Sequence, residues 1–119
     1  MFKTRNYEII LQFIKSRQTT LKEINFLFCK ITDDFLKQIS RIKNLNLTSL
    51  NLSGSSEFTN IGLRRLLETQ KNIRNLNISS CKLPPDESMM IISEFLPEIR
   101  ILRIADSDKQ LTEVSFYFV

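Results

Sequence analysis

Two cysteines are the residues of this chain whose side chains are the most reactive. Cys29 and Cys81 are the only thiols among 119 residues, and the chain contains no histidine. Structural zinc takes four cysteine or histidine ligands, so two thiols alone do not complete such a site. Without an imidazole base, neither a Cys-His nor a Ser-His-Asp arrangement can be assembled. We therefore expect these thiols to hold no metal and to catalyse no reaction.

Other candidates for catalysis are few. Only two glycines are present, so neither a phosphate-binding loop nor a dinucleotide-binding fingerprint can be built. The acidic pairs Asp33-Asp34 and Asp86-Glu87 fall at the expected starts of helices, where the helix dipole favours negative charge. The sequence predicts a protein that is not an enzyme and uses no cofactor and no small-molecule substrate.

A period of 26 residues gives the cysteines a structural role instead. Residues 21–26, 47–52, 73–78 and 99–104 read LKEINF, LTSLNL, IRNLNI and IRILRI, four copies of one L-x-x-L-x-L phrase. We expect each copy to form a strand of about six residues, and stacked copies to form parallel strands over one continuous core. Three residues after each phrase, the same register aligns Cys29, Ser55, Cys81 and Ser107.

The register also bears on whether the two cysteines can form a disulfide. Parallel strands two repeats apart are separated by about 9.5 Å, whereas the Cα atoms of bridged cysteines lie within about 7 Å. A bridge between Cys29 and Cys81 is therefore disfavoured. We expect these residues, with Ser55 and Ser107, to pack at the corner between strand and turn and to bond weakly to the backbone of the next turn. Reduced, buried cysteines favour an intracellular compartment.

The segments that connect the strands predict helices over residues 35–42, 61–68 and 88–96. In each segment, apolar residues recur at spacings of three and four. Thr32 and Asp33, Thr59 and Asn60, and Pro85 are the capping and first-turn residues that mark the starts. The expected core-facing residues are Phe35, Leu36, Ile39, Ile42, Ile61, Leu63, Leu66, Leu67, Met89, Ile92, Phe95 and Leu96.

The two ends of the chain differ from the repeats. Residues 1–20 predict a basic amphipathic helix that caps the core, with a mitochondrial presequence as the alternative interpretation. After Ile104, Leu111, Val114 and Phe116 repeat the strand phrase and predict a short fifth strand without a helix. The chain then closes on Phe116, Tyr117, Phe118 and Val119. We expect this apolar C-terminal edge to bind a partner, since an open edge with an apolar tail otherwise promotes aggregation.

Residues that follow the strands indicate a family. SSEFTNIGL at 55–63 matches the pattern C-x-x-I/L-T-D-x-G-L with Ser for Cys, Phe for Ile and Asn for Asp; CKITDDFL is one residue shorter, and CKLPPDESM replaces the T-D pair with prolines. The chain thus resembles the cysteine-containing leucine-rich repeats of F-box/leucine-rich-repeat substrate receptors and of small relatives without an F-box. The resemblance implies an α/β fold, a short right-handed β-α solenoid with its parallel sheet on the concave face and its helices on the convex face.

We expect a single domain over residues 1–119. It comprises an N-terminal capping helix (1–20), repeats at 21–46, 47–72 and 73–98, and a last strand with a C-terminal cap (99–119). A formal charge of +4 permits an acidic partner. Arg64-Arg65 is the only adjacent basic pair, which disfavours nucleic acid. No apolar run approaches the roughly 20 residues of a membrane span.

The concave face is the predicted binding surface. Two rows of residues alternate with the core positions, with basic residues beside them; together they are Glu23, Ser49, Asn75, Ile101, Asn25, Asn51, Asn77, Arg103, Lys22, Arg74 and Arg100. We expect this face to bind a protein surface or an extended peptide. The alternative for the asparagines is structural, with stacked amides bonding one another across neighbouring strands. The first and third copies differ at Glu23 against Asn75 and at Leu27-Phe28 against Ser79-Ser80. We expect these differences to vary with function.

Two functions fit these features. The first is a small scaffold or assembly subunit of a larger intracellular complex, in the cytoplasm or in a mitochondrial or ciliary assembly. The second is the substrate-recognition part of an F-box/leucine-rich-repeat ubiquitin ligase adaptor. The residues before Leu21 are too few for an F-box module, which counts against a complete receptor.

Overall fold

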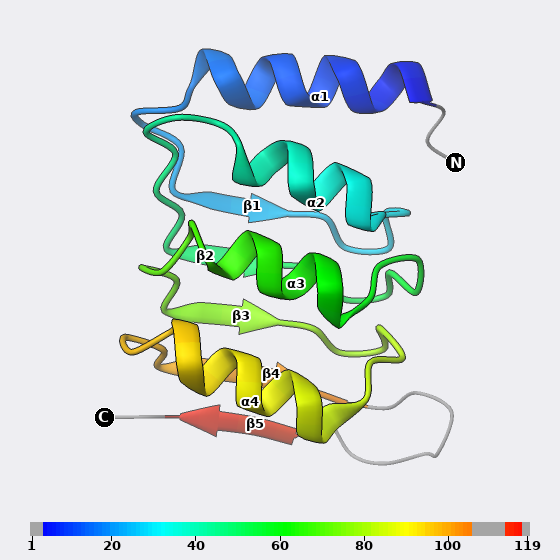
Figure 1. The fold of residues 1–119 in the computed structure, drawn as a ribbon, viewed down its shortest axis with the longest axis vertical. Helices are drawn as coiled ribbons and strands as arrows, with labels where there is room; N and C mark the ends of the chain where they lie inside the picture. Colours follow the sequence, from blue (N-terminus) through cyan, green and yellow to red (C-terminus); the bar gives the residue numbers. More distant parts are fainter. Residues whose placement is uncertain (1–3, 106–113, 118–119) are drawn as a thin grey trace.

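The computed structural model describes residues 4–105 and 114–117, and the side chains of residues 7–105. Helices and strands alternate along the chain as far as the fourth strand (Figure 1). The helices are α1 (Thr4–Ser16), α2 (Asp33–Ser40), α3 (Asn60–Leu67) and α4 (Pro85–Phe95). The strands are β1 (Glu23–Asn25), β2 (Ser49–Asn51), β3 (Asn75–Asn77), β4 (Ile101–Ile104) and β5 (Val114–Tyr117). The chain is therefore a small α/β protein.

The first four strands are parallel neighbours in the order of the sequence. Ile24 pairs with Leu50, Leu50 with Leu76, and Leu76 with Leu102, an offset of 26 residues at every step. This confirms the register predicted from the repeated phrase. The strands are shorter than predicted, since β1, β2 and β3 each contain three residues. Single backbone hydrogen bonds extend the pairing beyond them, as from Phe28 N to the carbonyl oxygen of Ser53 at 2.9 Å.

All of α2, α3 and α4 lie on one side of the sheet, which leaves its other face uncovered (Figure 1). The core fills the space between the two layers. Leu50, Leu76 and Leu102 project into it from the strands, and Leu36 and Leu63 project from the helices. Burial of these residues confirms the predicted alternation along the strands, in which every second side chain turns towards the helices.

Two of the predicted helix starts are capped by threonine. Thr32 Oγ1 accepts a hydrogen bond from Phe35 N at 3.1 Å, and Thr59 Oγ1 accepts one from Ile61 N at 3.1 Å. Pro85 is the first residue of α4, where its missing N–H leaves nothing unsatisfied. All three predicted starts are thus confirmed.

One predicted core residue is on the surface. Ile61 is 70% exposed, and the prediction that it faces the core is wrong. Because Thr59 is the cap, Asn60 and Gly62 are the residues of the first turn that are buried. Ser88 Oγ donates to Asn60 Oδ1 at 2.8 Å, so the buried amide is hydrogen-bonded to the next helix.

The predicted fifth strand is present, but it runs antiparallel to β4. A parallel strand needs a crossover of a dozen or more residues, and only nine residues, 105–113, separate Ile104 from Val114. The outer edge of β4 is therefore paired, and the open edge at this end of the sheet belongs to β5. Phe116 and Tyr117 lie in β5, whereas Phe118 and Val119 lie outside the described residues. Binding of a partner by this edge stays a prediction.

The aligned cysteine and serine residues form hydrogen bonds between repeats. Ser55 Oγ accepts from Ile31 N at 2.9 Å, and Cys81 Sγ donates to the carbonyl oxygen of Leu52 at 3.0 Å. Each bond reaches back to the preceding repeat, so the predicted direction, towards the next turn, is wrong. Cys29, a free thiol like Cys81, is half-buried. Ser107 lies outside the described residues.

Candidate functional site

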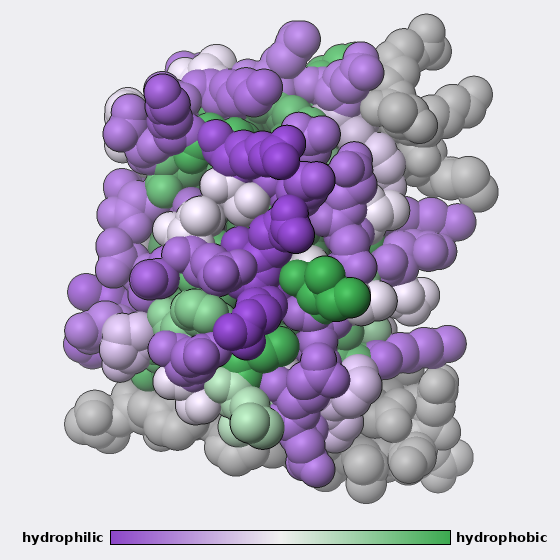
Figure 2. Space-filling model, in the orientation of Figure 1, coloured by the Kyte–Doolittle hydropathy of each residue, from purple (hydrophilic) through white to green (hydrophobic). Residues whose placement is uncertain are grey.

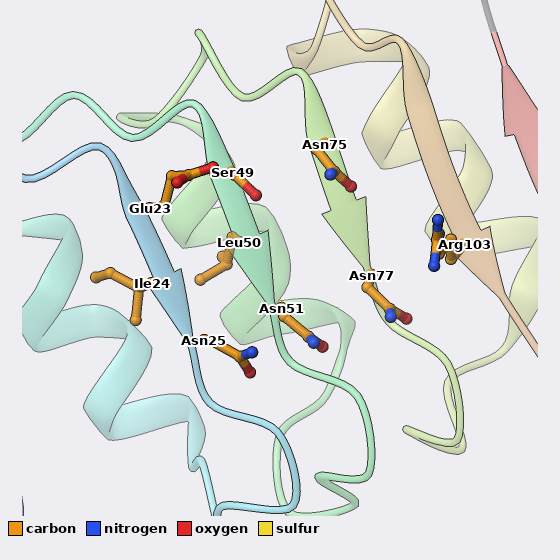
Figure 3. A pocket seen from close by; sticks show the side chains of 9 residues that line it. All are labelled: Glu23, Ile24, Asn25, Ser49, Leu50, Asn51, Asn75, Asn77 and Arg103. Atoms are coloured by element: carbon orange, nitrogen blue, oxygen red, sulfur yellow. The ribbon is translucent and has the colours of Figure 1, made fainter.

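A strip of polar side chains crosses the uncovered face of the sheet. Figure 3 shows these side chains projecting from four neighbouring strands. We define the polar strip as Glu23, Asn25, Ser49, Asn51, Asn75, Asn77 and Arg103. Together with the apolar Ile24 and Leu50, they line a shallow hollow of about 340 Å³. Residues more than twenty positions apart in the sequence thus share one surface.

The strand register explains how the strip is assembled. Glu23, Ser49 and Asn75 are direct neighbours across β1, β2 and β3, as are Asn25, Asn51 and Asn77. Since the residue between them on each strand turns towards the helices, both rows must project from the opposite face. The structure therefore brings together most of the residues predicted for the concave face.

Four residues of the predicted surface lie outside the hollow. Ile101 occupies the first row on β4 and is half-buried. Lys22, Arg74 and Arg100 are exposed and each immediately precedes a strand. The carbonyl groups of Lys22 and Arg74 take part in sheet pairing, as when Lys22 O accepts from Thr48 N at 2.8 Å. These basic side chains flank the polar strip without lining it.

The asparagine oxygens stabilise the turns that follow the strands. Oδ1 of Asn25, Asn51 and Asn77 accepts from the backbone N–H two residues on, at 2.9, 2.9 and 3.0 Å. Such Asx turns fix the backbone as it leaves a strand. The alternative in which these amides bond one another is wrong among the described residues. An amide pair between repeats is found elsewhere, where Asn72 Nδ2 donates to Asn46 Oδ1 at 2.8 Å.

This arrangement leaves hydrogen-bond donors on the strip. Each carboxamide carries an NH₂ group with two donor hydrogens, and those of Asn51 and Asn77 donate to no other described residue. Glu23 adds a carboxylate at the β1 end, and Arg103 adds a guanidinium group at the β4 end. The strip therefore offers amide donors between one negative and one positive group.

An apolar corner borders the strip where β1 ends. Phe28, Gly54 and Ser80 occupy equivalent positions in three repeats, and all have positive φ angles of 58°, 81° and 59°. This left-handed conformation is unfavourable for a bulky side chain. Phe28 nevertheless occupies it, is 77% exposed, and has its ring directly over Gly54. We call Leu27, which is also exposed, and Phe28 the apolar corner.

A second apolar surface lies on the helical side. Ile61 on α3 and Met90 on α4 are 70% and 72% exposed, and both line a groove between these helices. The ion pair of Arg64 with Glu94, at 3.2 Å, borders the groove. Figure 2 shows that this face of the molecule is mostly hydrophilic, with small hydrophobic areas. Sequence reasoning missed this surface, because an isoleucine at helical spacing is indistinguishable from a core residue.

The thiols differ in accessibility. Burial raises the pKa of the Cys81 thiol to about 11, with smaller opposing effects of backbone N–H groups of Ser55 and Gly54. Burial also raises the pKa of Cys29. Among residues 4–105 and 114–117, no three histidine, cysteine, aspartate or glutamate side chains are grouped to hold a metal ion. Neither thiol is activated for nucleophilic chemistry, which requires a lowered pKa.

No family model matches the sequence, and no match is found among curated proteins. Within the part of the chain that the structure describes, no helix combines the length and apolar character needed to cross a bilayer. Function is therefore inferred from the geometry of the molecule itself.

Proposed function

We propose that this protein is a leucine-rich-repeat solenoid of the cysteine-containing subfamily and a non-catalytic protein-interaction module. Its polar strip binds an extended segment of a partner protein. The observation that carries the proposal is the register, which aligns polar residues of four parallel strands on the face that the helices leave uncovered. Repeat proteins of this architecture use such extended surfaces for binding.

The strip has the dimensions and chemistry for a short segment. Four strands at a spacing of about 4.8 Å span about 14 Å, which matches four or five residues of extended chain. Amide NH₂ groups of Asn51 and Asn77 suit the carbonyl oxygens of such a chain. Glu23 at the β1 end favours a segment that is basic at that end.

The protein serves best as a scaffold or assembly subunit of an intracellular complex. The apolar corner and the groove with Ile61 and Met90 add two further exposed surfaces to a small chain. Exposed apolar surface of this kind marks sites of contact with other proteins. Cys81, buried as a free thiol, is compatible with a reducing compartment.

The protein is purified from its own cells, and native mass spectrometry identifies the partner that stays bound. Binding of that partner is then measured for wild type and for one isosteric double variant. Asn51→Asp with Asn77→Asp keeps the Oδ1 acceptors of both turns but removes the NH₂ donors from the strip. We expect the stoichiometric partner to bind at least tenfold more weakly to this variant. Asn72→Asp is the control for negative charge added outside the strip, with one new carboxylate against two in the double variant.

Two outcomes would contradict the proposal. A partner-free monomer in native mass spectra would argue against a scaffold subunit. Equal binding by Asn51→Asp/Asn77→Asp and by Asn72→Asp would show that the polar strip is not the binding surface. Ligase components that dissociate at moderate salt would instead favour the adaptor function.

A further inference from the structure

The neighbouring helices α3 and α4 form a groove on the outer surface of the helical layer (Figure 1). Ile61 of α3 and Met90 of α4 line this groove, and both are largely exposed. Ile91, which also lines it, is buried. The groove has a volume of about 290 Å³, and Figure 2 shows the surface of the helical layer around such hydrophobic areas as mostly hydrophilic. Two large apolar side chains on different helices thus share one exposed surface over a buried apolar floor.

Polar contacts between the two helices fix the groove. Ser88 Oγ donates to Asn60 Oδ1 at 2.8 Å, and both residues are buried. Asn60 Nδ2 also donates to the carbonyl oxygen of Pro84, just before α4, at 3.4 Å. One turn further along α3, Arg64 pairs with Glu94 at 3.2 Å. A partner therefore meets a surface that is already formed, and binding does not carry the cost of ordering it.

The backbone of the two helices determines the kind of chain that fits. The N–H and C=O groups of a helix lie along its axis, so the groove presents side chains and no row of backbone groups. An extended chain laid there would bury its own N–H and C=O groups without partners, which is unfavourable. A helix satisfies its own backbone and carries side chains three and four residues apart on one face. Such side chains can insert beside Ile61 and the flexible Met90.

Charge in the groove selects a basic helix. Its ionisable residues are Arg64, Glu87 and Glu94. Arg64 pairs with Glu94 and lies over the ring of Phe95, 5.0 Å from the centroid, so its charge is matched within the protein. Glu87 forms no ion pair with a described residue and follows the exposed Asp86. The dipole of α4 offsets only about half a unit of this charge, which leaves a negative excess.

The position of Glu87 fixes where the basic residue must lie. Glu87 and Met90 are three residues apart on α4, or about 4.5 Å along its axis. A helix beside α4 has the same spacing, so a basic residue one turn from its apolar contact meets the Glu87 carboxylate. Arg65, the next basic residue along α3, does not line the groove. Charges elsewhere on the chain are screened beyond about 8 Å at physiological ionic strength.

We propose that the groove between α3 and α4 binds a basic amphipathic helix of a partner protein. Apolar residues of that helix, three or four positions apart, contact Ile61 and Met90, and a lysine or arginine one turn away pairs with Glu87. The proposal rests on the scaffold function, because it assigns a partner to a surface that this function leaves open. It does not involve the polar strip, which lies on the face of the sheet that the helices leave uncovered.

The probe is a fluorescent alanine-based peptide of about 18 residues, long enough to form a helix in water. Two leucines lie four residues apart at its centre, with a lysine one turn before and one turn after them on the same face. The full-length protein carries ¹³C in its methionine methyl groups. We expect the methyl resonance of Met90 to shift on binding, and that of Met89, which is half-buried against the core, to shift much less. Replacement of both lysines with glutamate should weaken binding at least fivefold.

Variants at exposed positions provide matched comparisons, with fluorescence anisotropy as the measure of affinity. Ile61→Ser should weaken binding of the lysine peptide at least fivefold. Ile9→Ser, at an isoleucine of α1 that is 61% exposed, should leave it within twofold. Glu87→Gln should weaken binding about threefold, the size expected for one exposed ion pair, and should reduce the preference for lysine over glutamate. Glu8→Gln, on α1, should change neither quantity.

Several results would overturn the proposal. These are a Met90 resonance that does not shift, equal affinity for the lysine and glutamate peptides, and equal losses in Ile61→Ser and Ile9→Ser. Undiminished binding of a lysine peptide with a central proline would point to an extended occupant, because proline interrupts a helix. A Met90 shift that depends on the concentration of the protein alone, together with a dimer in size-exclusion chromatography, would assign the groove to a second copy.

The polar-strip variant separates this proposal from the proposed function. Asn51→Asp with Asn77→Asp should bind the lysine peptide as wild type does, although it should bind the purified partner more weakly. Weaker binding of the peptide by this variant would assign the peptide to the polar strip and overturn the groove proposal. A failure of the polar strip is seen only with the purified partner, and a failure of the groove is seen at Met90, so the two failures are distinguishable.

Discussion

At the scale of single residues, buried hydroxyl groups in neighbouring turns have opposite roles. Ser55 Oγ accepts from Ile31 N at 2.9 Å and donates to the carbonyl oxygen of Ile31 at 3.2 Å, so it satisfies two backbone groups of the preceding repeat. Ser79 Oγ, which is also buried, has no hydrogen-bond partner among the described residues. A buried polar group that lacks a partner costs stability, whereas one that satisfies buried backbone groups prevents that cost.

We predict that Ser55→Ala lowers the free energy of unfolding by about 1–3 kcal/mol, because it leaves buried backbone groups of Ile31 without partners. Ser79→Ala serves as the matched control and should change stability by less than about 0.5 kcal/mol. Urea denaturation of both variants measures the difference. Equal losses would show that the Ser55 bonds contribute nothing specific.

The thiol of Cys81 predicts a dependence of stability on alkaline pH. Burial raises its pKa to about 11, whereas cysteine in an unfolded chain has a pKa of about 8.5. The fold therefore holds this proton more tightly than the unfolded chain. Its contribution is complete below about pH 8.5, declines above that value and is lost as pH rises through 11. The decline is at most about 1.4 kcal/mol per pH unit.

The measurement compares wild type with Cys81→Ala by urea denaturation from neutral pH to about pH 10. We expect the stability advantage of wild type to shrink above about pH 8.5, while the other groups that titrate in this range affect both proteins alike. A constant difference across the range would contradict the prediction. Cys29→Ala tests specificity, since the half-buried Cys29 should produce a smaller pH effect.

At the scale of elements, α2 and α3 meet at a glycine. A Cβ atom added to Gly62 would overlap the carboxylate of Asp33 on α2. That carboxylate accepts from Thr59 N at 2.8 Å and from the Thr59 hydroxyl at 2.7 Å, which connects the first turn of α2 to the cap of α3. Because Gly62 has no side chain, α2 and α3 can approach closely. The Asp33 carboxylate then lies within hydrogen-bond distance of Thr59, the N-cap residue of α3.

We predict that Gly62→Ala is destabilising by about 1–3 kcal/mol, through overpacking. Alanine at an unobstructed helix position would stabilise by about 1 kcal/mol relative to glycine. Asp33→Ala combined with Gly62→Ala should recover part of the loss, because it removes the overlapping carboxylate. A thermodynamic cycle of the two single variants and the double variant measures this coupling. Strictly additive effects would mean that the two residues do not interact.

The sequence predicted the elements better than their connections. Thr32, Thr59 and Pro85 marked the helix starts correctly, because capping depends on local chemistry. Gln70 gave no comparable signal, although it is fully buried and its amide accepts from Leu47 N at 2.8 Å and donates to Leu45 O at 3.0 Å. A side chain that completes a turn from a distance of more than twenty residues cannot be identified from local pattern.

The polar strip also has features that the sequence predicts and features that it does not. Its membership followed from the 26-residue register and the alternation of side chains, both of which are encoded in the repeated phrase. The use of Asn51 Oδ1 by its own turn, and the exposure of Phe28 at a positive φ angle, depend on the backbone path after the strand. Neither feature changes the hydrophobic pattern, so neither could be predicted from it.

At the scale of the whole molecule, position along the stack determines how completely a residue is covered. The contacts between elements join mainly neighbouring strands and neighbouring helices, so residues of equal register differ in burial between the end and the middle of the sheet. Leu76 on β3 is completely buried between two parallel strands, whereas Ile24 on β1 has a strand on one side only and is half-buried. Stability should therefore be lowest at the β1 end of the described sheet and higher in its centre.

We predict that Leu76→Ala lowers the free energy of unfolding by about 2–5 kcal/mol, the range for a large side chain deleted from a closed core. Ile24→Ala should cost clearly less, because the site is partly open and can be filled by solvent or by neighbouring side chains of α1. Urea denaturation measures both losses, and native-state hydrogen exchange should show α1 and β1 opening at lower free energy than β3. Equal losses at the two positions would mean that the β1 edge is as well covered as the centre.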